Sequence, residues 1–295
     1  MTTLSAVAIQ VADFLRNEIL IPYGEMSPDR KLALDILDKW DVHDLKTPFQ
    51  VNIAQLKIRL KKLVEKPTLL NQGPFGTCAT EVFLYVILKD YPGKFVRYAI
   101  DMIESGSAHI GNLYIKTSKA FRNAKFELAL NAEMVSKGMD VCDILLIGAI
   151  RDSSNKFYSY DLTKDNWLME FFDSKSHSAN DEDLDFWFNE TKLYKPVTFI
   201  ENKNLSIADS LNLSCKNNET ILVMIYTAGN MQKPLEFTND KGKHICALYI
   251  NKIIKIPPDK CSISLVSWGT TLVQNMTEKG LKECVIGYFE VNSKG

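Results

Sequence analysis

Residues 71–80, which read NQGPFGTCAT, place a cysteine directly after a turn and before an apolar stretch. Two glycines and a proline break regular structure before it, and Thr77 is a residue type that caps helix N-termini. We therefore predict a helix over 78–90 that begins at Cys78, where the positive end of the helix dipole favours the thiolate. A thiolate is a nucleophile, so the pattern indicates nucleophilic catalysis.

Two further residues have the chemistry that such a nucleophile needs. Gln72 lies six residues before Cys78, across the predicted turn. Its side-chain amide, together with the backbone N–H groups at the helix start, would form an oxyanion hole. His244 opens a predicted buried strand over 244–250, where it is well placed to face a cleft as general base.

A second predicted strand, over 261–267, supplies candidates for the group that orients the histidine. If the two strands form a hairpin about the intervening proline turn, His244 lies opposite Val266 or Ser267. Ser264 would share a face with Val266 and be a diagonal neighbour of His244. Ser264, Ser267 or a backbone carbonyl could therefore orient the imidazole, whereas a valine cannot.

These segments resemble the active-site segments of papain-like cysteine peptidases. In that family a Gln-Gly pair precedes Gly-Ser-Cys-Trp at the same offset, and the matching positions here are Gln72, Gly73, Gly76 and Cys78. The family's Asn-Ser-Trp-Gly sequence is matched by Ser267, Trp268 and Gly269. The chain departs from the pattern at Thr77, at Ala79 in place of the aromatic residue, and at Val266 in place of the orienting asparagine.

The resemblance implies an α+β fold with Cys78 on a helical lobe and His244 on an antiparallel sheet lobe. It also implies that Cys78 attacks a carbonyl, His244 shuttles the proton, Gln72 stabilises the oxyanion and Trp268 shields the pair. The implied reaction is hydrolysis of a peptide, isopeptide or glutamine amide bond. The glycine pair that lines the substrate cleft in ordinary members is missing, which favours action on a specific protein partner, as intracellular bacterial effectors and toxins of this fold perform.

Two other functions stay open. Val266 and Ala79 are compatible with a papain-like protein that binds without catalysis. A deamidase or transglutaminase would use the same Cys78 and His244 pair. The sequence identifies neither the substrate nor the oligomeric state.

The chain divides by its hydrophobic periodicity. We predict an N-terminal helical extension or cap over 1–66, with helices near 4–20, 28–40 and 52–65, and a catalytic domain over 67–295. Within the latter, 67–190 is the helical lobe and 191–295, rich in β-branched and aromatic runs, is the sheet lobe. The basic residues of the third helix are expected on a solvated face: Lys57, Arg59, Lys61 and Lys62.

Composition excludes several classes of function. The 295 residues carry 35 basic and 36 acidic side chains, so no electrostatic case exists for nucleic acid. No apolar run is long enough to span a bilayer. No His/Cys cluster has zinc spacing and no phosphate loop occurs, so neither metal nor cofactor is expected.

The six cysteines are scattered without paired spacing. In the resembled family, secreted members carry a disulfide cysteine where Phe75 stands here. We therefore expect free thiols and a reducing, cytoplasmic compartment, with Cys142, Cys246 and Cys284 as core thiols. Delivery into a host cell by a non-classical route would fit the absence of a signal peptide pattern.

Overall fold

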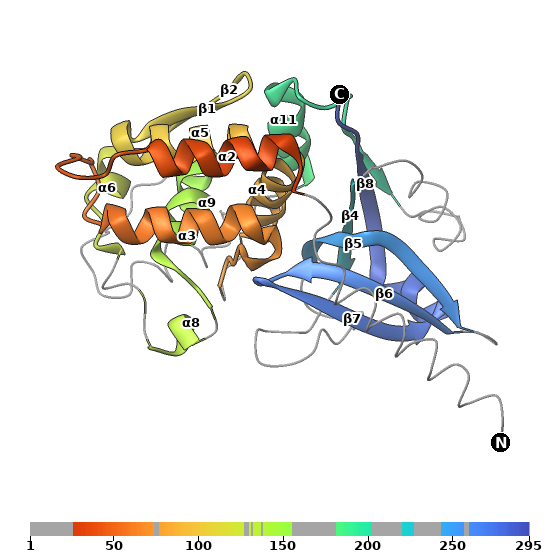
Figure 1. Ribbon diagram of the computed structural model, residues 1–295. Helices are drawn as coiled ribbons and strands as arrows, with labels where there is room; N and C mark the ends of the chain where they lie inside the picture. The colour runs from red at the N-terminus through yellow and green to blue at the C-terminus, as the bar shows by residue number, and fades with distance from the viewer. Residues whose placement is uncertain are drawn as a thin grey trace.

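Most helices lie in one half of the molecule and a six-stranded antiparallel sheet in the other, so the fold is α+β as predicted (Figure 1). The computed structural model describes residues 26–73, 77–126, 130, 132–136, 138–154, 181–201, 220–226, 243–256 and 260–294. The helix predicted over 4–20 lies outside these ranges, as does most of the loop between Gln72 and Cys78.

The helical half consists of α2 (Pro28–Lys39), α3 (Ile53–Glu65), α4 (Cys78–Asp90), α5 (Pro92–Ser105), α9 (Val141–Ser154) and α11 (Asp181–Thr191). Shorter elements join them: η1 (Pro67–Leu69), the hairpin β1 (Ser107–Ile110) and β2 (Leu113–Lys116), α6 (Lys119–Arg122) and α8 (Ala132–Ser136). Helices α2, α3 and α4 match the predicted ones to within a residue.

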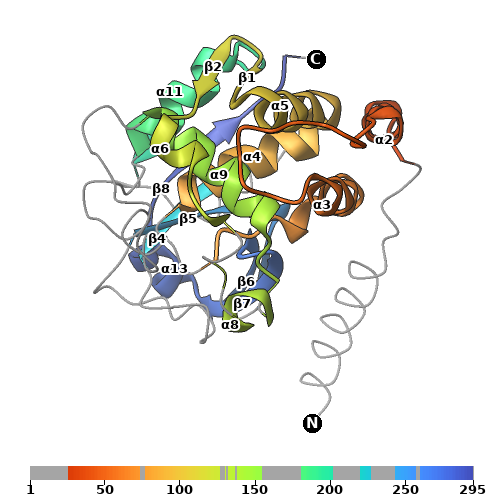
Figure 2. The same ribbon diagram turned by 90° about the vertical axis from the view of Figure 1, so that its left-hand side faces the viewer.

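Helix α4 is the centre of this half. Every residue from Ala79 to Leu88 is buried, because α5, α9 and α11 pack around the helix and strand β5 of the sheet packs against it. Figure 2 shows α4 and α9 in front of the six-stranded sheet. The residue that begins this helix, Cys78, therefore lies where the two halves meet.

Helices α2 and α3 share the core of the other helices. Side-chain caps start both: Ser27 Oγ accepts from the N–H of Arg30 at 3.3 Å, and Asn52 Oδ1 accepts from that of Gln55 at 3.2 Å. Their apolar faces, including Leu37 and Leu60, belong to the same hydrophobic cluster as α4. The described part of the predicted extension thus completes the core of the helical half.

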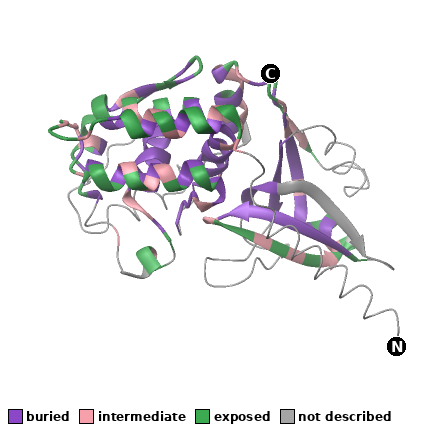
Figure 3. Ribbon diagram, viewed as in Figure 1, coloured by how far each residue is buried: buried purple, intermediate pink, exposed green. Residues whose placement is uncertain are grey.

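The sheet half is one six-stranded antiparallel sheet in the order β3-β8-β4-β5-β6-β7. Its strands are β3 (Phe199–Glu201), β4 (Thr220–Tyr226), β5 (Lys243–Ile256), β6 (Lys260–Ser267), β7 (Thr270–Thr277) and β8 (Val285–Val291). One face, with Ile245 and Ala247, joins the helical core, and the other, with Cys246 and Leu265, forms a second cluster packed by α13 (Glu278–Cys284). Central strands are accordingly buried, while β7 is largely exposed (Figure 3).

The predicted register of the β5–β6 hairpin is wrong. His244 does not lie opposite Val266 or Ser267, since Ala247 pairs with Val266. Strand β5 continues to Ile256 instead of ending at 250, and an irregularity between Leu248 and Ile253 shifts the pairing.

None of the helices in the described ranges has the length and apolar composition that crossing a bilayer requires. The five described cysteines are free thiols, and the three predicted as core residues, Cys142, Cys246 and Cys284, are buried. Cys215 lies outside the described residues.

Candidate functional site

Cys78 is the first residue of α4, as predicted, but Thr77 does not cap the helix. Its backbone angles, φ −111° and ψ 23°, differ from the extended conformation of a capping residue, and no side-chain cap hydrogen bond forms. The Thr77 hydroxyl is buried and finds no hydrogen-bond partner in the part of the chain that the structure describes. The start of α4 is therefore held by tertiary contacts and not by a local cap.

The Cys78 thiol is partly buried against the first residues of β5. The backbone amide of Ile245, the residue that follows His244, interacts with the sulfur. Burial raises the pKa of the Cys78 thiol, and the Ile245, Ala79 and Cys78 amides oppose that rise without cancelling it. The amides at the helix start favour the thiolate, as predicted, but desolvation outweighs them, so the pKa of the thiol is raised overall.

His244 forms a cluster with two of the predicted residues. Its Nε2 lies 2.8 Å from Ser267 Oγ, and its ring stacks on the Trp268 indole with centroids 4.5 Å apart and planes 16° apart. His244 and Ser267 are buried and Trp268 is half-buried, and burial lowers the pKa of His244 to about 4. The imidazole is therefore neutral at pH 7, oriented by Ser267 and covered by Trp268.

Ser264 and Val266 lie on the opposite face of the sheet from this cluster. Side chains alternate along a strand, and Val266 belongs to the core shared with the helices, two residues from Ser264. Ser267 lies on the other face, as does His244. Of the two serines that the sequence left open, Ser267 alone contacts the histidine, and the prediction that Ser264 is its diagonal neighbour is wrong.

Gln72 is buried, with 3% of its surface exposed. Its side-chain Oε1 has no hydrogen-bond partner among the described residues. A buried carbonyl oxygen without a protein partner is uncommon, because desolvating it costs free energy that no hydrogen bond recovers. This oxygen can accept from a donor of a ligand, whereas the oxyanion role predicted for Gln72 requires its side-chain N–H groups.

Cys78 packs against the sheet face that joins the helical core, whereas the His244 side chain lies on the opposite face, so the structure does not bring these two side chains together. No hydrogen bond connects the Cys78 thiol with the His244 ring within the described ranges. His244 Nδ1 is also without a partner there, since the ring's hydrogen bond to Ser267 uses Nε2. The nucleophile and the base are thus linked through the backbone of Ile245 and not through their side chains.

Glu81 is a site residue that sequence reasoning missed. It lies one helical turn after Cys78 and is 4% exposed. Its carboxyl group accepts from the backbone N–H groups of Gly269, Gln72 and Trp268, while burial raises its pKa to about 8. The available signal was a lone acid inside the otherwise apolar run of α4.

The prediction that the basic residues of α3 form a solvated face is wrong for one of them. Arg59 is not solvated: its guanidinium bonds both carboxylate oxygens of Asp143 on α9, at 3.2 and 2.5 Å, and donates to the carbonyl of Leu69 at 2.6 Å. Lys62 on the same helix is exposed, as predicted.

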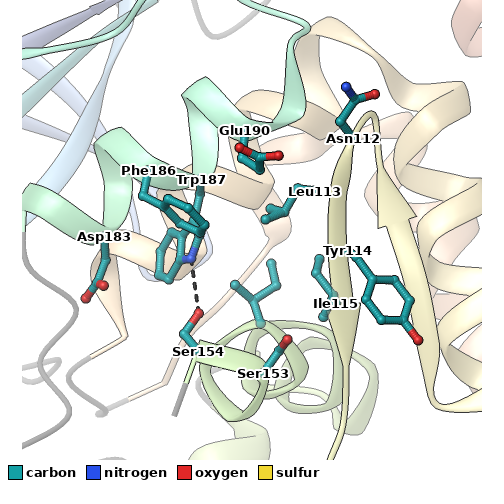
Figure 4. A pocket seen from close by; sticks show the side chains of 11 residues that line it. Asn112, Leu113, Tyr114, Ile115, Ser153, Ser154, Asp183, Phe186, Trp187 and Glu190 are labelled. Carbon is teal, nitrogen blue, oxygen red and sulfur yellow. Dashed lines mark hydrogen bonds between the residues drawn. The ribbon is translucent and has the colours of Figure 1, made fainter. Parts of the chain in front are cut away.

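A surface pocket of about 480 Å³ lies elsewhere, between β2, α9 and α11 (Figure 4). Trp187 donates its indole N–H to Ser154 Oγ at 3.1 Å on one wall, and Phe186 is 58% exposed at the rim. None of the residues that line it belongs to the Cys78 site. Within the described residues, no group of His, Cys, Asp or Glu side chains could hold a metal ion.

Comparisons of the chain with protein-family models, with curated proteins and with solved structures found no match in any of the three. The likeness to papain-like peptidases therefore depends on the matching residues themselves and on how they lie in the fold.

Proposed function

We propose that the chain is a papain-like thiol hydrolase with Cys78 as nucleophile and His244 as general base. The observation that supports this most is the cluster of His244, Ser267 and Trp268 at the start of β5, where the backbone amide of the next residue, Ile245, interacts with the Cys78 sulfur. An imidazole with one nitrogen held by an acceptor and its ring covered by an indole is the arrangement that the papain-like resemblance implies, with Ser267 in the role of the missing asparagine.

The protonation states of Cys78 and His244 determine the first step. When Nε2–H of His244 donates to Ser267 Oγ, the lone pair on Nδ1 can accept a proton. Because burial raises the pKa of Cys78 and lowers the pKa of His244, the resting pair is a neutral thiol and a neutral imidazole. The thiol proton then moves to Nδ1 as the sulfur attacks, in general-base catalysis, and no preformed ion pair is involved.

The remaining steps follow from acyl transfer chemistry. The new sulfur–carbon bond places negative charge on the substrate oxygen, which accepts from the Gln72 side-chain amide and the Cys78 backbone N–H. The carbon–nitrogen bond breaks, and the amine leaves with the proton from His244. Water, deprotonated by His244, then cleaves the thioester and releases the acid. Because His244 lies on the sheet face away from the helices and Cys78 packs against the helical core, the start of β5 must turn the ring toward the sulfur when substrate binds.

The substrate class is a peptide, isopeptide or glutamine amide in a specific protein. The test begins with labelling of Cys78 by a thiol-directed epoxide such as E-64, located by mass spectrometry. We expect stoichiometric labelling of Cys78 that is lost in Cys78→Ala and unchanged in the matched variant Cys142→Ala, whose thiol is buried. Ubiquitin-like chains, peptides and glutamine donors are then screened, and Cys78→Ala and His244→Ala should each abolish turnover.

A non-catalytic binding protein is the second candidate, favoured by the missing Cys78–His244 hydrogen bond in the described structure and by Val266. The two functions differ in what His244 does. Acylation of Cys78 by p-nitrophenyl acetate should fall by on the order of a hundredfold in His244→Ala if the imidazole is a general base. An unchanged acylation rate in His244→Ala, with no turnover of any amide, would support the binding protein instead.

A further inference from the structure

The Glu81 carboxyl group connects three parts of the candidate site. It belongs to α4, one turn from Cys78, and accepts from the N–H groups of Gln72, Trp268 and Gly269. These donors come from the loop before α4 and from the turn after β6. No ion pair of Glu81 occurs in the part of the chain that the structure describes, so backbone amides alone hold this buried acid.

The turn that supplies two of the donors has an uncommon backbone. Trp268 has φ 50° and Gly269 has φ 70°, and together they form the two-residue connection between Ser267 and Thr270. Two successive left-handed residues define a type I′ hairpin turn, in which a tryptophan is unusual. The conformation directs both N–H groups at Glu81 while the Trp268 ring stacks on His244.

The third donor belongs to the loop that carries Gln72, whose side chain is the proposed donor to the oxyanion. The backbone N–H of Gln72 is bound by Glu81, and that of Asn71 by Asp143 on α9. Two successive amides of one loop are thus held by buried carboxyl groups on two different helices. Asn71 Oδ1 also accepts from the Gly73 N–H at 2.9 Å, which fixes the loop further.

We propose that Glu81 is a positioning residue for acyl transfer, which holds the Gln72 loop and the Trp268–Gly269 turn in place around Cys78. This inference rests on the proposed function, because it assigns Glu81 to the oxyanion donor of that reaction. Glu81 does not touch the reacting atoms. It acts through Gln72 on one side and, through Trp268, on the cover of His244.

The charges near Glu81 are compatible with this role. The titratable groups that face it are Asp143 on α9, Cys78 on its own helix and Cys246 on β5. Because burial raises the pKa of Glu81 to about 8, the group is largely a neutral acid at pH 7. It can accept from amides without placing a negative charge beside the thiol that has to ionise.

The experiment compares two reactions of Cys78 in the full chain. Acylation by p-nitrophenyl acetate develops an oxyanion, whereas alkylation by iodoacetamide does not, so their rate ratio measures oxyanion stabilisation apart from thiol reactivity. We expect Gln72→Ala to lower this ratio by about a hundredfold. Glu81→Met, which fills similar space but accepts no hydrogen bond, should lower it at least tenfold, and Glu81→Gln, which keeps a carbonyl acceptor, should stay within about threefold of wild type.

The double variant distinguishes positioning from a general structural effect. If Glu81 acts through Gln72, then Gln72→Ala adds little in a Glu81→Met background, since the donor is already misplaced. The matched control is Thr80→Val, which removes a buried hydroxyl without a hydrogen-bond partner among the described residues from the same helix and should leave the ratio unchanged. Multiplicative effects of the two variants, or an equal loss in Glu81→Gln and Glu81→Met, would overturn the proposal.

Two results separate this inference from the proposed function. Acylation that persists in Cys78→Ala would contradict the function itself. A loss in Gln72→Ala with wild-type rates in Glu81→Met would contradict only the role of Glu81. If Glu81→Met does not fold, amide NMR of the wild-type chain still decides: the N–H resonances of Gln72, Trp268 and Gly269 should share one titration that Glu81→Gln abolishes, and independent shifts would overturn it.

Discussion

Two buried carboxyl groups, Asp143 and Glu81, hold the same loop in different ways. Asp143 receives the Asn71 N–H and a two-point ion pair from Arg59. Glu81 receives the next amide, that of Gln72, and has only two further N–H groups as partners. The first group is neutralised by a cation within the helical half, whereas the second is held by dipoles that reach across to the sheet.

The difference bears on where each group can be charged. Burial raises the pKa of Asp143 to about 7, with Arg59 and the Asn71 N–H opposing the rise, so an ionised Asp143 has a counterion. An ionised Glu81 would have none, and burial takes its pKa to about 8. An ion pair suits an anchor within the helical half, and a neutral acceptor suits the turn of helix that carries Cys78.

The largest effect is expected from breaking the ion pair. Arg59→Met leaves the Asp143 carboxyl buried without its cation, which costs about 3–5 kcal/mol of unfolding free energy. The measurement is urea denaturation followed by circular dichroism at pH 7. The matched control is Lys61→Met on the same helix, where the ion pair with Asp38 is exposed, and its midpoint should not move. An equal loss in both variants would remove the distinction between a buried anchor and a surface pair.

The second effect is a pH dependence that belongs to Glu81. Folded Glu81 keeps its proton up to about pH 8, whereas the unfolded chain releases it near 4.5. Between these values the folded state binds more protons, so the unfolding free energy falls as pH rises. His244, whose folded pKa lies below its ordinary 6.5, has the opposite effect only below that value.

Asp143, whose pKa burial raises to about 7, also titrates between pH 6.5 and 8, so the contribution of Glu81 is isolated by comparing wild type with Glu81→Gln. Wild type should lose up to about 2 kcal/mol of unfolding free energy relative to Glu81→Gln across this range. Urea titrations of both chains at the two pH values give the comparison, with Asp143 present in each. Parallel stability curves would mean that Glu81 is ionised in the folded protein at neutral pH.

Local sequence patterns predicted the helices and strands of the site better than the contacts between their side chains. The start of α4 at Cys78, both helices before it and strands β4 to β6 follow from turn residues, caps and periodicity over short stretches. Strand β7 was missed because its alternation of exposed and intermediate residues was hidden behind the motif at 267–269. Each of these elements is determined by residues that are close together in the sequence.

The failures involve groups far apart in sequence. Which serine meets His244 depends on a register that the length of β5 and its irregularity determine. The pKa of Cys78 depends on how deeply α4 is covered by other helices and by β5, which no local rule reports. Arg59 was assigned to a solvated face because its partner, Asp143, lies 84 residues away. The papain-like resemblance itself stays a prediction that the experiments above test.

The smallest effect concerns two glycines that flank Asn71, one on the side of each acid. Gly269 and Gly138 both have positive φ, 70° and 82°, so alanine at either position costs about 1 kcal/mol of backbone strain. A Cβ on Gly138 would lie 3.7 Å from Asn71 Nδ2, an ordinary contact, whereas a Cβ on Gly269 would lie 2.9 Å from Asn71 Cβ. Asn71 cannot move away easily, because its side chain holds the Gly73 N–H.

Gly269→Ala should therefore destabilise the chain by about 1 kcal/mol more than Gly138→Ala, in the same urea titration. It should also lower the ratio of acylation to alkylation at Cys78, since the displaced turn no longer presents its N–H groups to Glu81. Gly138→Ala should leave that ratio unchanged, because it lies on the side of the Arg59 and Asp143 anchor, where Arg59 donates to the Gly138 carbonyl at 3.4 Å. Equal ratios in the two variants, with unequal stabilities, would assign the turn at 268–269 to folding alone and leave Glu81 without its link to the sheet.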